Sequence, residues 1–314
     1  MTRRVLTYAL LIALAHTPCA LAQETTAFAF LRNDVGARSA ALAGSVVALT
    51  NDPAALFVNP ASLATLESPS AGAGFFKHLL DINAGYAVYG RQLEGIGAVG
   101  AGVLYTNYGT FDRTDDFGNT TGTFTASDLA ASLGYSNELQ QNLTYGAALK
   151  FIYSSIAGYT SSALAADAGI LYRIPESRLT LGASIRNMGR MVATYAGVSE
   201  PLPLDVAVGL SIVPRGLPLL LDVDFHRLNE NPGSFIDRFG AFTVGGEFTL
   251  SRVIRARFGY NNQARKDLQT GTTAGLAGFS AGIGITVSAY QVDYALSSLG
   301  TIGNLHRVSV GMTL

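Results

Sequence analysis

The chain has 314 residues, of which 48% are hydrophobic and 14% are charged, and its formal net charge at pH 7 is -1. This balance offers no basic surface, so the composition argues against a nucleic-acid partner. Beyond the amino terminus there is no uninterrupted apolar stretch of about 18 residues, which argues against a membrane-spanning helix. High hydrophobicity with 35 glycines and few charges instead suits a chain whose apolar side chains face lipid at every second position.

Residues 1–22 have the pattern of a secretory signal peptide. Two arginines precede the apolar run 5–15, and Ala20-Leu21-Ala22 offers a small-residue cleavage site. The paired arginines also fit twin-arginine export, but a barrel has to cross the inner membrane unfolded, which favours ordinary secretion. The single cysteine, Cys19, lies inside this segment, so the mature chain is expected to carry neither a disulfide nor a lipid anchor.

Residues 23–66 are predicted to form a compact, partly helical plug. The stretch from Ala37 to Leu49 is rich in small residues that can pack closely in a confined space. Asp52-Pro53 and Asn59-Pro60 each place a capping side chain before a proline, which is a helix-start signal. A segment of this length fits the lumen of a wide barrel, and a loose periplasmic tail is the alternative.

Residues 67–314 are predicted to form an all-β fold, a transmembrane antiparallel β-barrel of about 14 strands in the outer membrane. The prediction rests on a period of two: Leu149 and Phe151, for example, fall on one strand face and Lys150 on the other. Lipid is therefore the expected partner of the apolar face. Strands are expected near 71–77, 81–90, 95–107, 124–136, 143–155, 161–174, 179–188, 204–213, 217–227, 240–250, 253–261, 275–287, 289–297 and 305–314.

The predicted connections alternate in length, as in outer-membrane barrels with short periplasmic turns and longer external loops. Both termini are then expected in the periplasm. Short turns are expected at 91–94, 137–142, 175–178, 214–216, 251–252 and 288, and longer loops at 108–123, 156–160, 189–203, 228–239, 262–274 and 298–304, with 78–80 as a short exception. Aromatic girdles near the strand ends are expected from Tyr86, Tyr105, Tyr135, Tyr153, Tyr172 and Tyr260.

The plug segment carries a signature that resembles the amino-terminal signature of the PorV/PorQ family of outer-membrane proteins, which is related to the FadL-type transporters. Ile152 to Ser155 and the closing stretch from Asp293 to Arg307 are especially similar to the PorQ branch. The chain departs from that pattern where it ends in Leu314, because many barrels end in phenylalanine. The signature residues are Gly36, Arg38, Gly44, Asn51, Asp52, Asn59 and Pro60.

The resemblance implies a non-enzymatic accessory or docking component of type IX protein secretion, with secretion-system or surface proteins as partners. The FadL relationship implies an alternative, a transporter of hydrophobic small molecules, which needs an apolar pocket. A membrane-embedded enzyme is a third hypothesis, but no Ser/His/Asp grouping supports it. We expect no cofactor and no metal, since the histidines of the mature chain lack ligand spacing.

The inward faces of the predicted strands carry charges of both signs. An ion-selective pore would favour one sign, whereas a plugged lumen uses paired charges. We therefore expect Arg38 or Asp52 of the plug to pair with a wall charge. The polar lumen-facing residues are Lys150, Asp167, Arg173, Arg186, Asp205, Asp222, Asp224, His226, Glu247, Arg255, Arg257, Asp293 and Arg307.

Two acidic groupings leave alternatives open. His226 lies beside Asp222 and Asp224 on one strand face, where a solvated or paired cluster is favoured over a proton or metal group. The longest predicted loop contains Asp112, Asp115, Asp116 and Asn119, which read as a plain polar loop or as calcium ligands.

Overall fold

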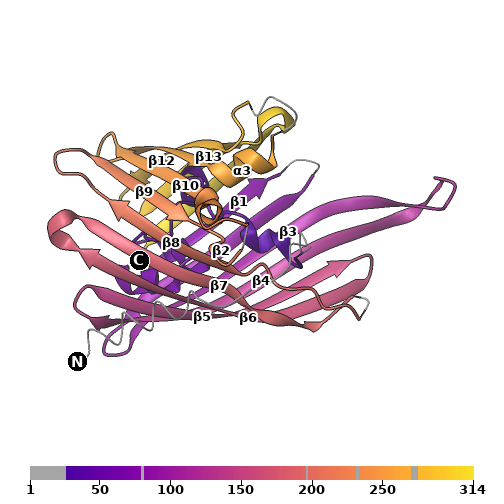
Figure 1. Ribbon diagram of the computed structural model, residues 1–314, viewed down its shortest axis with the longest axis horizontal. Helices are drawn as coiled ribbons and strands as arrows, with labels where there is room; N and C mark the ends of the chain where they lie inside the picture. Colours follow the sequence, from indigo (N-terminus) through magenta and orange to yellow (C-terminus); the bar gives the residue numbers. More distant parts are fainter. Residues whose placement is uncertain (1–25, 79–80, 196, 231–232, 270–274) are drawn as a thin grey trace.

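The computed structural model describes residues 26–78, 81–195, 197–230, 233–269 and 275–314. In these residues fourteen antiparallel strands close into a single barrel, in which every strand pairs with its neighbours in the chain and β1 pairs with β14 (Figure 1). The predicted all-β barrel and its strand number are confirmed. No helix among these residues is long and apolar enough to cross a membrane. The predicted signal peptide lies outside the described residues.

Each predicted strand corresponds to one strand of the barrel, with ends shifted by a few residues. The strands are β1 (Ser70–Lys77), β2 (Asn83–Leu93), β3 (Gly97–Thr114), β4 (Thr120–Gln140), β5 (Leu143–Ile156), β6 (Tyr159–Ile174), β7 (Leu179–Ala193), β8 (Asp205–Ile212), β9 (Leu219–Phe225), β10 (Phe242–Thr249), β11 (Ile254–Asn261), β12 (Phe279–Val287), β13 (Tyr290–Ser298) and β14 (Asn304–Thr313).

Burial follows the period of two that the sequence shows. Along β5, Leu149 is 70% exposed on the outer face while Lys150 beside it is 5% exposed on the inner face. The outer face of the neighbouring strands is equally apolar, with Leu133 and Leu164 among its exposed side chains. Such a surface is stable only where the surrounding solvent is itself apolar, as in a lipid bilayer.

The two ends of the barrel differ in their connections. At one end, which we call the short-turn end, the connections are 94–96, 141–142, 175–178, 213–218, 250–253 and 288–289. The carboxyl-terminal Leu314 lies at this end, where its backbone N–H donates to the carbonyl of Pro69. At the other end, the long-loop end, the connections 194–204, 226–241 and 262–278 include the short helices η5 (Ile236–Gly240) and α3 (Asn262–Asp267).

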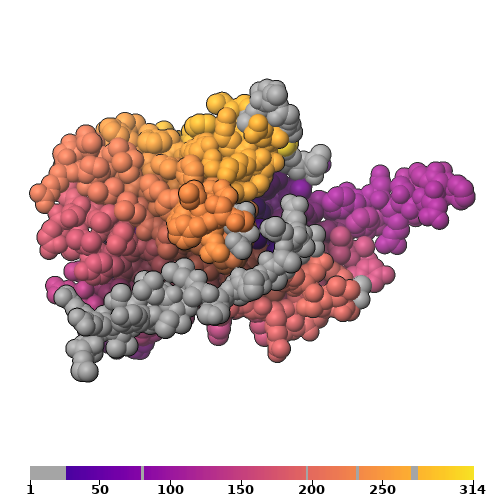
Figure 2. All heavy atoms as spheres, in the orientation of Figure 1, coloured from indigo at the N-terminus to yellow at the C-terminus, as the bar shows by residue number. Residues whose placement is uncertain are grey.

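The β3–β4 connection differs from the predicted loop at 108–123. Both strands continue well past the rim as one projecting hairpin, which is plain in Figures 1 and 2. Its aromatic rings pack together, with Phe111 and Phe124 stacked at 5.3 Å between centroids. The loop predicted at 156–160 is likewise a tight turn, because β5 and β6 pair as far as Ile156 and Tyr159.

The acidic stretch at the tip of this hairpin closes a turn. The Asp115 carboxylate accepts hydrogen bonds from the backbone N–H groups of Phe117 and Asn119 at 2.9 and 2.8 Å. Within the described part of the chain, no group of three or more histidines, cysteines or acidic residues is placed to hold a metal ion. The Asp115 contacts are those of a polar turn, and the calcium alternative stays a prediction.

One of the girdle tyrosines is placed on the wrong face by the sequence prediction. Tyr86 is 8% exposed and points into the lumen, where its ring lies 6.4 Å from that of Phe57. The inward face of β2 also carries Ala84 and Val88, so the parity of the strand determines this orientation. The tyrosines at 105, 135, 153 and 172 are exposed on the outer face.

An arginine on the lipid face tests the membrane placement. Leu149→Arg puts a charge at the middle of β5, and we expect it to lower the free energy of unfolding by about 2 to 4 kcal/mol. Leu139→Arg is the control, because Leu139 is 67% exposed near the short-turn end of β4 and should cost only about 0 to 1 kcal/mol. Urea titrations in lipid vesicles measure both, and equal costs would contradict the placement.

Candidate functional site

The lumen is filled by the segment that precedes β1. It contains η1 (Ala29–Arg32), α2 (Ala37–Ala41), η2 (Pro53–Phe57) and η3 (Pro60–Thr65). α2 packs against β11 to β14, η2 against β1 to β3, and η3 against β3 to β6. At the long-loop end the backbone N–H of Ala27 donates to the carbonyl of Pro201. The segment, which we call the plug, thus crosses the lumen from the long-loop end to the short-turn end.

The two Asx-Pro elements begin the helical turns of the plug. Asp52 accepts from the N–H of Ala54 at 2.9 Å, and Asn59 accepts from that of Ala61 at 3.1 Å. Prolines at the next position lose no hydrogen bond there. Asn59 is fully buried, and its amide also donates to the carbonyl of Val47 in the plug at 2.8 Å.

The remaining signature residues shape the plug backbone. Gly36 and Gly44 have φ values of 87° and 82°, which favour glycine. Asn51 has a φ of 54°, and its backbone N–H donates to the Thr65 hydroxyl at 2.8 Å. The backbone N–H of Ala37 donates to Ser309 of the wall at 2.8 Å. These residues set the course of the plug through the lumen.

Glycines of the wall allow the plug to lie directly against the sheet, a role that the sequence did not reveal. A Cβ atom at Gly146 would lie 2.4 Å from the backbone of Pro60. One at Gly182 would lie 2.5 Å from the carbonyl oxygen of Val47, and one at Gly259 would meet the Leu42 backbone at the same distance. The period of two places such glycines inward, but only the position of the plug shows what they contact.

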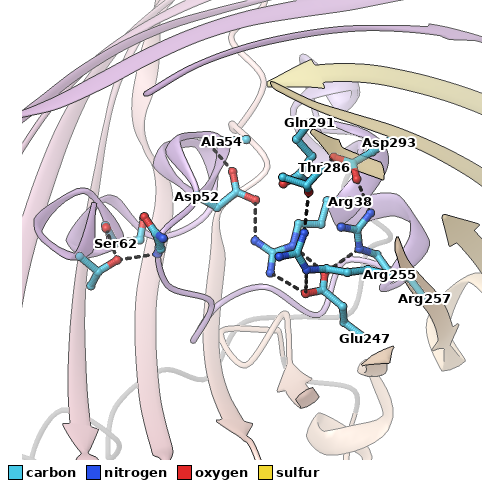
Figure 3. Close-up of polar contacts among 12 residues, drawn as sticks. Arg38, Asp52, Ala54, Ser62, Glu247, Arg255, Arg257, Thr286, Gln291 and Asp293 are labelled. Atoms are coloured by element: carbon cyan, nitrogen blue, oxygen red, sulfur yellow. Dashed lines mark hydrogen bonds and ion pairs between the residues drawn. The ribbon is translucent and has the colours of Figure 1, made fainter. Parts of the chain in front are cut away.

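An ion-pair cluster joins the plug to the wall at Glu247 (Figure 3). Arg38 of the plug donates from Nε to Glu247 at 3.0 Å and contacts Asp52 at 3.3 Å. Arg257 donates to the same carboxylate at 2.6 Å and to Asp293 at 2.5 Å. Arg255 lies 3.8 Å from Glu247 and donates to Thr286 at 2.7 Å. Arg38, rather than Asp52, therefore makes the expected contact with a wall charge.

The charge state of Arg38 follows from this environment. Burial by itself would lower the pKa of Arg38, but Glu247 and Asp52 outweigh burial and raise it. The guanidinium therefore stays charged at physiological pH, as its pairs with Glu247 and Asp52 require.

A second cluster of polar side chains surrounds Lys150 on the inner face of β5. Lys150 pairs with Asp167 at 2.8 Å and donates to Asn187 at 2.7 Å. Asn187, with a φ of 58°, occupies a bulge in β7, and its backbone N–H donates to Asp167 at 2.7 Å. These buried contacts give the side chain and the backbone N–H of Asn187 their partners.

His226 lies between two aspartates of the wall, and one of them also contacts the plug. Its imidazole is 3.5 Å from Asp205, which pairs with Arg186, and 4.0 Å from Asp224. Asp224 in turn accepts from the backbone N–H of Val47 at 2.8 Å. These side chains thus form a paired cluster.

The other predicted inward charges are also found on the lumen side. Asp222 is 1% exposed on β9. Arg307 on β14 lies over the ring of Phe76, 5.2 Å from its centroid, and donates to Ser297 at 3.1 Å. Arg173 is half-buried near the short-turn end of β6.

Several cavities remain beside the plug, and two of them lie toward opposite ends of the barrel. The upper cavity, of about 110 Å³, lies toward the long-loop end, and the lower cavity, of about 190 Å³, lies toward the short-turn end. Apolar side chains line one side of the upper cavity, including Leu31, Phe57 and Leu104, while Lys150 and His226 line another. The upper cavity is therefore amphipathic.

Asp34 of the plug also borders the upper cavity. Burial raises the pKa of Asp34, and the nearby Arg307 opposes that shift. Sequence reasoning did not single out Asp34, because it precedes the signature and its burial depends on the path of the plug.

The wall has a seam between β7 and β8. β7 pairs with β8 only as far as Arg186, so β7 has no strand partner on that side over residues 187–193. The connection 194–204 lies there, and its Pro203 carbonyl accepts from the Asn187 amide at 3.0 Å. Leu202 of this connection is 5% exposed and packs into the core.

Comparisons with solved structures identify the same fold. The toluene transporter TodX of P. putida gives a TM-score of 0.59 at 15% identity, over 89% of this chain and 98% of TodX. A FadL homologue of Pseudomonas aeruginosa gives 0.57 at 12% identity, over 89% of this chain and 98% of that one. CymD, described as a monoaromatic hydrocarbon channel, gives 0.59 at 12% identity, over 89% and 97%.

At these identities the likeness shows a shared fold, that of FadL-type transporters and channels. Neither a protein-family model nor a curated protein sequence matches the chain. The resemblance to the PorV/PorQ family therefore receives no specific support, whereas the expected relationship to FadL-type proteins agrees with the fold.

Removing Arg38 tests the attachment of the plug. Arg38→Ala leaves Glu247 with fewer partners in a buried site, and we expect a loss of about 3 kcal/mol in the free energy of unfolding. It should also speed hydrogen exchange in α2. Arg32→Ala is the control, because its pair with Glu230 is solvent-exposed and should contribute less than about 1 kcal/mol. Equal effects of the two variants would show that Glu247 does not hold the plug.

Proposed function

We propose that this protein is a non-enzymatic outer-membrane channel that transports hydrophobic small molecules. The observation that carries the proposal is an amphipathic cavity between plug and wall, where apolar side chains such as Phe57 and Leu104 lie opposite charged ones such as Lys150, because ligand sites combine an apolar lining with placed polar groups. The fold adds support, since the similar structures named above are described as a toluene transporter, a FadL homologue and a monoaromatic hydrocarbon channel.

The proposal includes the location and organisation of the chain. Residues 1–22 act as a cleaved signal peptide, residues 23–66 as the plug, and residues 67–314 as the barrel, with lipid around the outer face. The short-turn end, which holds Leu314, faces the periplasm, and the long-loop end faces outward, as in other outer-membrane barrels.

The role in type IX secretion rests on a sequence resemblance alone, which the plug signature and the stretches Ile152 to Ser155 and Asp293 to Arg307 carry. Signature residues such as Arg38 and Asn59 make contacts within the plug and to the wall, which a plugged transporter needs as well. No comparison points to secretion-system or surface proteins as partners. The geometry therefore favours transport.

Uptake by intact cells tests the proposal, because a lipopolysaccharide leaflet slows the entry of hydrophobic solutes. Cells that produce the protein should take up radiolabelled benzyl alcohol faster than cells with an empty vector. Ala130→Phe, which fills the upper cavity from β4, should reduce this gain by about tenfold, the scale of pocket discrimination.

Ala147→Phe is the matched control, since Ala147 lies on the lipid-facing side of β5 and its ring would extend into the bilayer. It should leave uptake unchanged. If wild-type cells are no faster than vector cells, although folded barrel is present in the membrane, the transport function is wrong.

A further inference from the structure

Three residues form a row across the inner face of β3, β4 and β5. Gly102 lies opposite Ser132 in the β3–β4 ladder, and Ser132 lies opposite Lys150 in the β4–β5 ladder. Side chains directly opposite each other in antiparallel strands start about 5 Å apart. The row, which we call the Ser132 row, therefore places a hydroxyl and an ammonium group side by side on the wall of the upper cavity.

Phe57 of the plug covers one end of the Ser132 row. A Cβ atom at Gly102 would lie 2.5 Å from the Phe57 ring, so the ring rests directly on this glycine. Leu104 and Ala130, the next inward pair of the same two strands, continue the apolar surface. All three side chains line the upper cavity. The row is therefore apolar at the Phe57 end and polar at the Lys150 end.

The polar end of the row has hydrogen-bonding capacity to spare. Ser132 is 2% exposed, and its Oγ has no hydrogen-bond partner among the described residues. The Lys150 ammonium carries three protons, of which Asp167 and Asn187 accept two, at 2.8 and 2.7 Å. Buried polar groups are nearly always hydrogen-bonded. A hydroxyl and one ammonium proton are thus available for an oxygen atom of a ligand.

The charges around the row favour a neutral ligand. Asp167 is in contact with Lys150, and Asp205 is in contact with Arg186 at the same cavity. A ligand carboxylate beside Lys150 would lose its water shell and would meet Asp167 as a like charge. A neutral hydroxyl avoids both costs, because it can accept from Lys150 and donate to Ser132.

The volume of the upper cavity limits the size of the ligand. It is about 110 Å³. An engineered apolar cavity of about 150 Å³ binds one benzene molecule. A ligand with a single ring is therefore the largest that matches the cavity.

We propose that the Ser132 row selects neutral one-ring solutes that carry a hydroxyl group, such as phenols, over the corresponding hydrocarbons and carboxylates. The ring of the solute packs against Phe57 and Leu104, and its hydroxyl exchanges hydrogen bonds with Ser132 and Lys150. The proposal rests on the transport function stated above and names the chemical class of the solute.

Binding to the purified protein tests this selection. The probes are 4-fluorophenol and 4-fluorotoluene, and fluorine NMR titrations at one detergent concentration give the ratio of their affinities. Ser132→Ala removes the hydroxyl. We expect it to lower the affinity for the phenol relative to the toluene by about tenfold, the scale of one hydrogen bond in a buried site. An unchanged ratio would overturn the proposal.

Ser184→Ala is the matched control. Ser184 is 3% exposed on the inner face of β7, and its Oγ also has no partner among the described residues, but it does not border the upper cavity. The ratio should stay as in the wild type. An equal fall in both variants would show that the loss of a buried serine hydroxyl acts through the fold, which would contradict contact between Ser132 and the ligand.

A third probe, 4-fluorobenzoate, tests the charge of the ligand in the wild type. At neutral pH we expect it to bind about tenfold more weakly than 4-fluorophenol, because its charge has to be buried. Tighter binding of the benzoate would rule out a preference for neutral solutes.

The same titrations separate this proposal from the transport function. If Ser132→Ala binds the phenol and the toluene as the wild type does, while Ala130→Phe weakens both, hydroxyl selection is wrong and transport of hydrophobic solutes stands. If no probe binds and cells that produce the protein gain no uptake, both are wrong.

Discussion

Backbone polar groups cannot be left unpaired in hydrocarbon, and the rest of this structure depends on that constraint. Fourteen strands satisfy it by closing on themselves, so that each has two partners among the described residues. Closure at this strand number leaves a lumen too wide for inward side chains alone to fill. The chain fills it with its own amino-terminal segment, and the inner wall is adapted to that segment through glycines such as Gly146 and Gly182.

The plug brings polar groups into a confined space, where each needs a partner. Arg38 meets this need through Glu247, and Asn59 through the Val47 carbonyl and the turn that it caps. These contacts hold the two ends of the plug's central region. Arg38 thereby fastens the plug to β10, and Asn59 also donates to the Ile170 carbonyl of β6 at 3.2 Å. Polar contacts on opposite sides of the lumen therefore fix the course of the segment.

Strand number and strand faces could be predicted from the sequence, because the alternation of apolar and polar residues is a local pattern. Contact with lipid requires an apolar side chain at nearly every outward position, as exposed Leu149 next to buried Lys150 illustrates. The caps at Asp52 and Asn59 were equally readable, since an Asx-Pro pair acts on its own backbone. The projecting β3–β4 hairpin was not, because its polar, glycine-containing stretch near Gly118 has the composition of a loop.

Contacts between distant segments were also beyond the sequence. The charges of the wall were visible, but the choice of Glu247 as the partner of Arg38 depends on where the plug backbone runs. Tyr86 was assigned outward from its nearness to a strand end, although its parity points inward.

A structure of the purified protein soaked with 4-bromophenol gives the most direct test that solutes occupy the lumen. The bromine should appear by anomalous scattering in the upper cavity, beside Phe57 and Leu104. Bromine found only on the lipid-facing wall, with neither lumenal cavity occupied at saturating probe, would contradict the account.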